Sequence, residues 1–232
     1  MGWMIRMIRG MVRRGRKQTL RRIPSSEKLP SLWPASSNPV EARPDLGVLQ
    51  GASTQALEEL CDDYWRSFDS ESDGEADEAA VVRDSIVRSE ALKELATRRG
   101  QSLAWACKRL RHPEHFARRD AAWLVGELCS RNPQDCDLDA VIGELSRLAT
   151  RPIEEDTKEA EANAVALASL SRIGGPRIIP TLREILTSPR WEQDDLSWEA
   201  ARILGVLLNV PFGESEDPVA SAREWVALNS DG

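Results

Sequence analysis

Residues 164–186 read AVALASLSRIGGPRIIPTLREIL, and this stretch decides the fold class. An alanine-rich segment runs up to Ile173, a Gly-Gly-Pro sequence interrupts it, and an apolar stripe at helical spacing follows. Glycine and proline stop and restart helices, so the stretch predicts two helices joined by a tight turn. The small alanine side chains allow neighbouring helices to approach closely, which favours helix-on-helix packing.

The same pattern recurs before three prolines, Pro113, Pro152 and Pro189, which are 39 and 37 residues apart. Alanine-rich helices are predicted at 116–130, 157–173 and 195–209, with Asp217 as the cap of a last helix. Self-similarity at such a period is typical of helical repeats. We therefore predict an all-α protein, an α-solenoid of about four antiparallel helix pairs over residues 79–229. Its apolar stripes comprise Leu103, Ala106 and Leu110, then Val141, Ile142, Leu145, Leu148 and Ala149, then Ile178, Ile179, Leu182, Ile185 and Leu186.

Residues 110–126 and 164–186 resemble the helix-turn-helix consensus of the HEAT-repeat family, in the short form also found in phycobilisome lyases. The register set at Gly126 places Ser171 and Gly205 at equivalent sites. The resemblance implies a HEAT-like solenoid that acts as a non-catalytic scaffold and binds another protein through its concave face.

Residues 1–53 are interpreted as a basic leader followed by a disordered linker rich in Pro and Ser. Residues 1–23 carry eight basic side chains and no acid, and residues 24–53 carry five prolines. The apolar runs are too short for a signal peptide or a transmembrane segment. Three interpretations of the leader stay open: weak contact of residues 1–17 with a membrane surface, a targeting segment, or an over-extended start.

Residues 54–78 are predicted to form a short helix and an acidic linker. The helix covers 54–68 with Thr54 as its cap, and residues 58–78 hold ten acids against Arg66. The stretch from Asp69 resembles the first half of an EF-hand loop, but Ala80 stands where the bidentate Glu belongs. We therefore expect a solvated linker here and no calcium site.

Charge and cysteine usage restrict the compartment and the partner. The net charge is −7, and an acidic body is a poor nucleic-acid ligand because phosphate contacts need Lys and Arg. The four cysteines show no CxxC spacing, and Cys107 and Cys129 lie among apolar residues like small core side chains. We expect reduced thiols, a cytoplasmic location and no nucleic-acid partner.

The sequence gives little support for catalysis. Its two histidines, His112 and His115, fall in a predicted turn, and no phosphate-binding glycine loop or Ser-His-acid arrangement is visible. We expect no enzyme, no metal and no cofactor. Two alternatives remain: an enzyme or enzyme subunit of lyase type acting on a tetrapyrrole-bearing protein, implied by the family resemblance alone, and an inhibitory or immunity-type protein for a basic target.

One basic patch stands out in the repeat region, and it is the candidate docking site for an acidic partner, which could be the 58–78 segment of this chain. Tryptophan and arginine are the residues that most often dominate binding energy at interfaces. Trp123 and Trp198 lie inside alanine-rich helices and are expected in the core. The candidate partner-binding residues are Trp105, Lys108, Arg109, Arg111, Arg118, Arg119 and Trp191.

Overall fold

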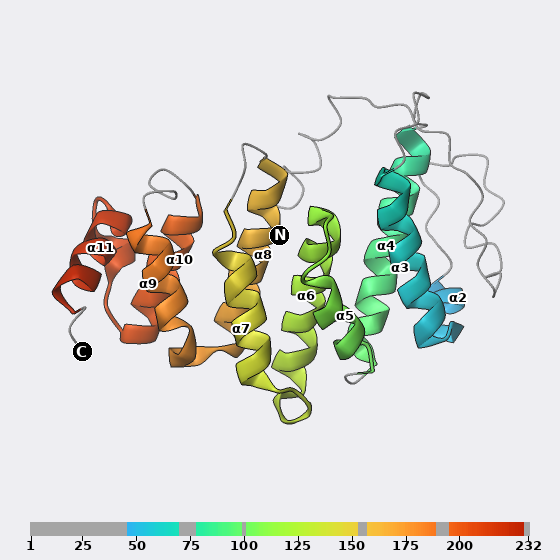
Figure 1. Ribbon diagram of the computed structural model, residues 1–232, viewed down its shortest axis with the longest axis horizontal. Coiled ribbons are helices and arrows are strands. Elements are labelled where there is room, and N and C mark those ends of the chain that lie inside the picture. The colour runs from blue at the N-terminus through green and yellow to red at the C-terminus, as the bar shows by residue number, and fades with distance from the viewer. Residues whose placement is uncertain (1–45, 70–77, 99–100, 153–156, 189–194, 230–232) are drawn as a thin grey trace. The chain divides into compact units, whose positions relative to one another are not determined.

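The computed structural model describes residues 46–69, 78–98, 101–152, 157–188 and 195–229 (Figure 1). Within these ranges the chain is all-α, with α-helices and short 3-10 turns and no strand. The chain divides into two compact units, residues 1–95 and 96–232. No helix in the described part of the chain is long and apolar enough to cross a membrane. The basic leader, the centre of the acidic linker and Trp191 lie outside the described residues.

The first unit contains α2 (Leu46–Gly51), α3 (Thr54–Asp69) and most of α4 (Glu78–Thr97). Residues 46–51 were assigned to the linker from its composition, but they form a helix because the apolar run LGVL follows the last proline of that linker. The predicted helix over 54–68 is present, yet its cap is Ser53, whose Oγ accepts from the Ala56 amide at 3.1 Å. Leu57 and Cys61 are buried on one side of α3, as its spacing predicts.

The second unit holds the repeats. Its α-helices are α5 (Leu103–Arg109), α6 (His115–Arg131), α7 (Leu138–Ala149), α8 (Thr157–Ile173), α9 (Ile179–Thr187), α10 (Asp195–Leu208) and α11 (Pro218–Leu228). Short 3-10 turns at 133–135, 175–178 and 212–214 connect them. The three alanine-rich helices, α6, α8 and α10, agree with their predicted ranges to within one residue at each end.

These helices pack on helices one or two places away in the sequence, in the row from α5 to α11 that Figure 1 shows. The closest packing joins α6 to α8, where Gly126 faces Ser169 and the Ser169 Oγ donates to the Ala122 carbonyl at 2.8 Å. α7 packs on α8, α9 packs on α10, and α11 contacts both α9 and α10. Contacts that stay between elements close in the sequence are the pattern expected of a solenoid.

The predicted stripes form the core of this unit. All five apolar residues predicted on α7 are buried, and so are Ile178, Leu182, Ile185 and Leu186 around α9. Burying an aliphatic side chain stabilises the fold by about 1.5–3 kcal/mol, so these stripes hold the second helix of each pair on the alanine-rich layer. The Asp217 carboxylate accepts from the Ala220 amide at 2.9 Å, which confirms the predicted cap.

A polar side chain is buried at the same register of each alanine-rich helix. Arg118, Asn163 and Ser197 each lie eight residues before Gly126, Ser171 and Gly205, and all three are buried. The Asn163 amide donates to the Arg151 carbonyl at 2.8 Å, and Arg118 donates to two carbonyls of the turn before α6. In α6 and α8 this register position thus satisfies backbone carbonyls in the preceding connection, as buried carbonyls require.

Candidate protein-interaction face

The clearest concentration of exposed positive charge lies where α5 and α7 end. Lys108 in the last turn of α5 and Arg147 in the last turn of α7 are both exposed. They are 39 residues apart, the distance that separates Pro113 from Pro152, so they are equivalent positions of successive repeats. The negative end of each helix macrodipole favours cations at these places. Arg111 and Arg151 follow their helices directly, and we call these four side chains the basic face.

One carboxylate lies within the basic face and orients two of its guanidinium groups. The Glu144 carboxylate accepts hydrogen bonds from Arg111, which follows α5. It also accepts from the Nη2 of Arg147, on its own helix, at 2.7 Å. Hydrogen bonding to Arg111 is the main reason that the pKa of Glu144 falls to about 2, with Arg147 adding to the effect. Glu144 is therefore charged at neutral pH and holds both arginines side by side, with 68% of the Arg111 side chain still exposed.

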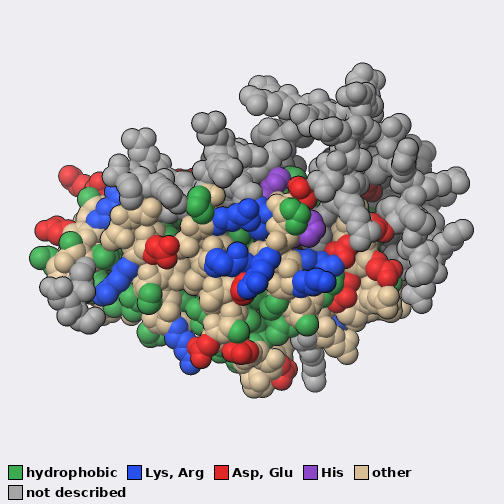
Figure 2. All heavy atoms as spheres, in the orientation of Figure 1, with side chains coloured by type: hydrophobic (Ala, Val, Ile, Leu, Met, Phe, Trp, Pro, Cys, Tyr) green, Lys and Arg blue, Asp and Glu red, His purple; other side chains and the backbone are tan. Residues whose placement is uncertain are grey.

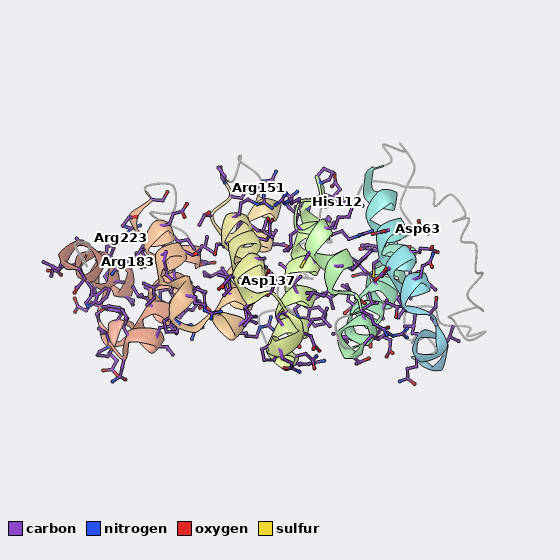
Figure 3. All side chains as sticks on the ribbon, turned by 60° about the horizontal axis from the view of Figure 1, so that its bottom comes forward. Asp63, His112, Asp137, Arg151, Arg183 and Arg223 are labelled. Carbon is purple, nitrogen blue, oxygen red and sulfur yellow. The ribbon has the colours of Figure 1, made fainter. Side chains whose placement is uncertain are left out.

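The other two cations of the basic face are Lys108, which is exposed, and Arg151, which is half-buried. Among the described residues, the charged groups of Lys108 and Arg151 make no ion pair. Figure 2 shows Lys and Arg side chains gathered over the middle helices of the second unit, with the histidines beside them. Figure 3 places Arg151 and His112 toward one edge of these helices and Asp137 away from that edge, at the start of α7. The face thus carries four cations and one carboxylate.

Trp105 and Arg109 form a local pair next to the basic face. The guanidinium of Arg109 lies over the Trp105 ring at 4.2 Å and donates to the Trp105 carbonyl at 3.3 Å. Both side chains are half-buried. A cation stacked on an indole is attracted by the ring quadrupole, so the two side chains stabilise each other's positions on α5.

The structure corrects two of the predicted binding residues. Arg118 is fully buried, and its guanidinium donates to the carbonyls of His112 and Pro113 within the turn. Arg119 is only 20% exposed and pairs with Asp120 and, at 3.0 Å, with Glu161 of α8. Both arginines follow the exposed cluster in sequence, but the helical turn that begins at His115 directs them inward. Their contacts lie within the second unit, between α6 and the turn before it and between α6 and α8.

The tryptophan expectations are also corrected at one position. Trp198 of α10 is 50% exposed, although its alanine-rich surroundings predict a core residue. Its register position is that of Arg119 in α6, which reaches the next alanine-rich helix through Glu161. No described alanine-rich helix follows α10, so this ring has no such neighbour among the described residues. Trp123 is half-buried.

Two further arginines have a structural role at the last helix pair. Arg183 of α9 donates to the Asn229 carbonyl at 3.0 Å, and Arg223 of α11 donates to the Leu186 carbonyl at 2.7 Å. Each arginine therefore caps the C-terminal end of the other helix. Figure 3 shows the two residues next to one another. They add positive charge to this side of the unit but are committed to backbone carbonyls.

Sequence reasoning did not select Arg147 and Arg151 as binding residues. The signal that could have found Arg147 is the repeat period, which pairs it with Lys108. Arg151 is aligned by its proline with His112, a residue whose Nδ1 accepts from the Glu114 amide at 3.1 Å. No period in the sequence shows that Glu144 bonds Arg111, because that contact joins α7 to the turn that follows α5.

Comparison of the chain with protein-family models, curated proteins and solved structures finds no match.

Proposed function

We propose that the second unit is a non-catalytic scaffold that binds an acidic segment of another protein across the basic face. The observation that carries the proposal is the exposed trio Lys108, Arg111 and Arg147, with the half-buried Arg151, on a chain whose net charge is −7. A cationic patch on an acidic protein attracts anionic partners locally, while like charges repel them elsewhere.

The arrangement of the arginines supports recognition of carboxylates in particular. Glu144 already holds Arg111 and Arg147 in fixed positions, so less side-chain freedom is lost when a partner binds. A guanidinium presents five donors, and those that Glu144 does not use can bind a second carboxylate with two parallel hydrogen bonds.

We also propose that the repeats are of HEAT type. The support is the shared register of three buried polar residues, Arg118, Asn163 and Ser197, which have the same spacings of 45 and 34 residues as Gly126, Ser171 and Gly205. Such repeats expose a row of second helices, to which α5 and α7 belong, as a binding surface. A cytoplasmic location is part of this proposal and rests on the absence of a disulfide-type cysteine pattern in the sequence.

The test measures binding of a short fluorescein-labelled glutamate-rich peptide by fluorescence anisotropy. The double variant Lys108→Gln with Arg147→Gln removes two exposed cations of the face. Each exposed ion pair contributes about 0.5 kcal/mol, so the two changes together weaken binding about fivefold. Added salt should weaken binding of the wild type more than binding of the variant.

The matched control is Arg131→Gln with Arg202→Gln, which removes the same charge from α6 and α10. This control should bind the peptide like the wild type, because neither residue lies on α5 or α7. Equal loss of binding in both double variants would show that only net charge matters and would contradict the proposal. Tighter binding of a single-stranded RNA oligonucleotide than of the peptide would point to a phosphate ligand instead.

A further inference from the structure

Two arginines of the last helix pair carry charge that no described carboxylate neutralises. Arg183 of α9 and Arg223 of α11 are both half-buried, and Figure 3 shows them next to one another. The Arg183 guanidinium also lies 5.9 Å from the ring centre of Trp225, which comes two residues after Arg223. Six other arginines of this unit each bond a carboxylate: Arg111, Arg119, Arg131, Arg147, Arg172 and Arg202. The proposed binding function uses neither Arg183 nor Arg223.

The acidic residues beside these two arginines do not supply the missing charge. Glu184 follows Arg183 and Glu224 follows Arg223 in the sequence, and both glutamates are exposed. One residue turns an α-helix by about 100°, so each glutamate starts from a different side of its helix than the arginine before it. In the part of the chain that the structure describes, neither glutamate makes an ion pair. Two like charges therefore lie close together, which costs energy unless an anion offsets them.

Backbone carbonyls at the ends of α9 and α11 offset only part of this charge. The Nη2 of Arg183 donates to the Asn229 carbonyl at 3.0 Å, and the Nε of Arg223 donates to the Leu186 carbonyl at 2.7 Å. The C-terminal end of a helix carries about half a negative charge, so the two ends together offset about one of the two positive charges. The Nε of Arg183 and the Nη2 of Arg223 are buried and have no acceptor among the described residues. About one positive charge and several N–H groups thus remain unused.

We propose that Arg183 and Arg223 form a binding site for one carboxylate group between α9 and α11. A carboxylate accepts hydrogen bonds through two oxygens and matches the planar fork of a guanidinium. Each of the two neighbouring guanidiniums can donate to it through N–H groups that the backbone carbonyls do not use. Its single negative charge equals the charge that the helix ends leave, whereas a phosphate dianion would bring excess negative charge toward the same carbonyls.

The carboxylate has two candidate sources that share this chemistry. One is a partner protein, through an acidic side chain or a free C terminus. The other is Asp231 of this chain, which follows Asn229 by two residues in the sequence and lies outside the described residues. None of the four side chains of the basic face belongs to this site. The site therefore does not rest on the proposed function, and either proposal can fail without the other.

The full chain, labelled with isotope-enriched arginine, reports on each guanidinium separately by NMR. The Nε–Hε signals are recorded at slightly acidic pH while sodium acetate replaces sodium chloride at constant ionic strength. The variants Arg183→Lys and Arg223→Lys assign the two signals. Both signals should shift and saturate with the same dissociation constant, because one carboxylate contacts both side chains. The signals of Arg131 and Arg202 should not follow that curve, because each of these side chains already bonds a glutamate.

Removal of one arginine should weaken acetate binding at the other. Arg223→Gln should raise the acetate dissociation constant measured at the Arg183 signal about tenfold, because the charge-assisted hydrogen bonds of one guanidinium are lost. Arg223→Lys keeps the charge but not the fork, so its affinity should lie between that of Arg223→Gln and the wild type. This second variant decides the question if Arg223→Gln does not fold. The matched control Arg202→Gln removes the same charge from α10 and should bind acetate like the wild type.

Two further arms identify the source of the carboxylate and the class of anion. If Asp231 occupies the site, Asp231→Asn should bind acetate more tightly than the wild type; if a partner occupies it, the two affinities should be equal. Either result agrees with a carboxylate site. Sulfate, a dianion, should bind more weakly than acetate. The proposal would be overturned by signals that do not shift with acetate, by an unchanged dissociation constant in both Arg223 variants, or by tighter binding of sulfate.

Discussion

Packing of α6 on α8 depends on the missing side chain of Gly126, and a second helical glycine, Gly143, provides an internal comparison. A Cβ built on Gly126 would lie 2.5 Å from the Ser169 Oγ and 2.7 Å from the Ser169 Cβ. A Cβ built on Gly143 of α7 meets no atom within 4 Å, and this glycine is exposed. Substitution by alanine therefore adds a methyl group without room for it at Gly126 and in open space at Gly143.

The two substitutions should change the free energy of unfolding in opposite directions. Alanine is favoured over glycine in a helix by about 1 kcal/mol, so Gly143→Ala should stabilise the protein by about that amount. Gly126→Ala gains the same propensity, but overpacking a tight core costs about 1–3 kcal/mol. Rotating the Ser169 hydroxyl away breaks its bond to the Ala122 carbonyl, which costs about 1 kcal/mol more. The net loss is about 1–3 kcal/mol, so the two variants should differ by about 2–4 kcal/mol.

Urea unfolding followed by far-UV circular dichroism measures this difference directly. A third variant combines Gly126→Ala with Ser169→Gly, which removes the two closest atoms and leaves the Ser169 Cα at 3.2 Å from the new Cβ. This combination should be more stable than the sum of its single variants predicts, by about 1 kcal/mol or more, because the two positions share one contact. Equal stability of Gly126→Ala and Gly143→Ala would show that α6 and α8 do not approach each other as closely as described.

Further variants test the caps, the buried cation and the basic face. Asp217→Ala should lower the free energy of unfolding by about 1 kcal/mol, because α11 loses the acceptor of its Ala220 amide, and urea midpoints measure the loss. Arg118→Met should destabilise by about 2 kcal/mol or more in the same assay, because two turn carbonyls lose their donor; a change near zero would contradict the structural role. The pKa of Glu144 in the folded protein lies below its usual value. The ionised carboxylate therefore stabilises the fold fully above pH about 4.5, and this stabilisation is lost as the pH falls toward about 2. The difference in free energy of unfolding between the wild type and Glu144→Gln should therefore decrease as the pH falls through that range. Urea midpoints measure this difference, and a value that does not change with pH would refute the ion-pair geometry.

Local periodicity was enough to place the helices of the second unit. The stripe from Val141 to Ala149 is buried at all five predicted positions, because a helix with one apolar face has only one way to remove it from water. The cap at Asp217 was equally readable, since capping involves a side chain and an amide three residues away. The helix at 46–51 was missed because an average over a proline-rich segment hides a short apolar run at its end.

The basic face could be predicted from the sequence only in part. The sequence cluster Lys108, Arg109 and Arg111 includes two members of the basic face, but its continuation to Arg118 and Arg119 crosses a turn. Beyond that turn the direction of each side chain depends on where α6 lies against α5 and α8. Arg118 consequently points into the turn and Arg119 toward Glu161, and no linear pattern of charges contains that information.

The sequence by itself determined the all-α class, the repeat period and the residues that face the core, because hydrophobic spacing and helix-breaking residues act over a few neighbouring positions. Only the tertiary structure decided which polar groups meet: Glu144 with Arg111, and the Ser169 hydroxyl with the Ala122 carbonyl beside Gly126. Those meetings depend on the offset between packed helices. That offset follows from side-chain shapes on both helices at once, which no single stretch of sequence specifies.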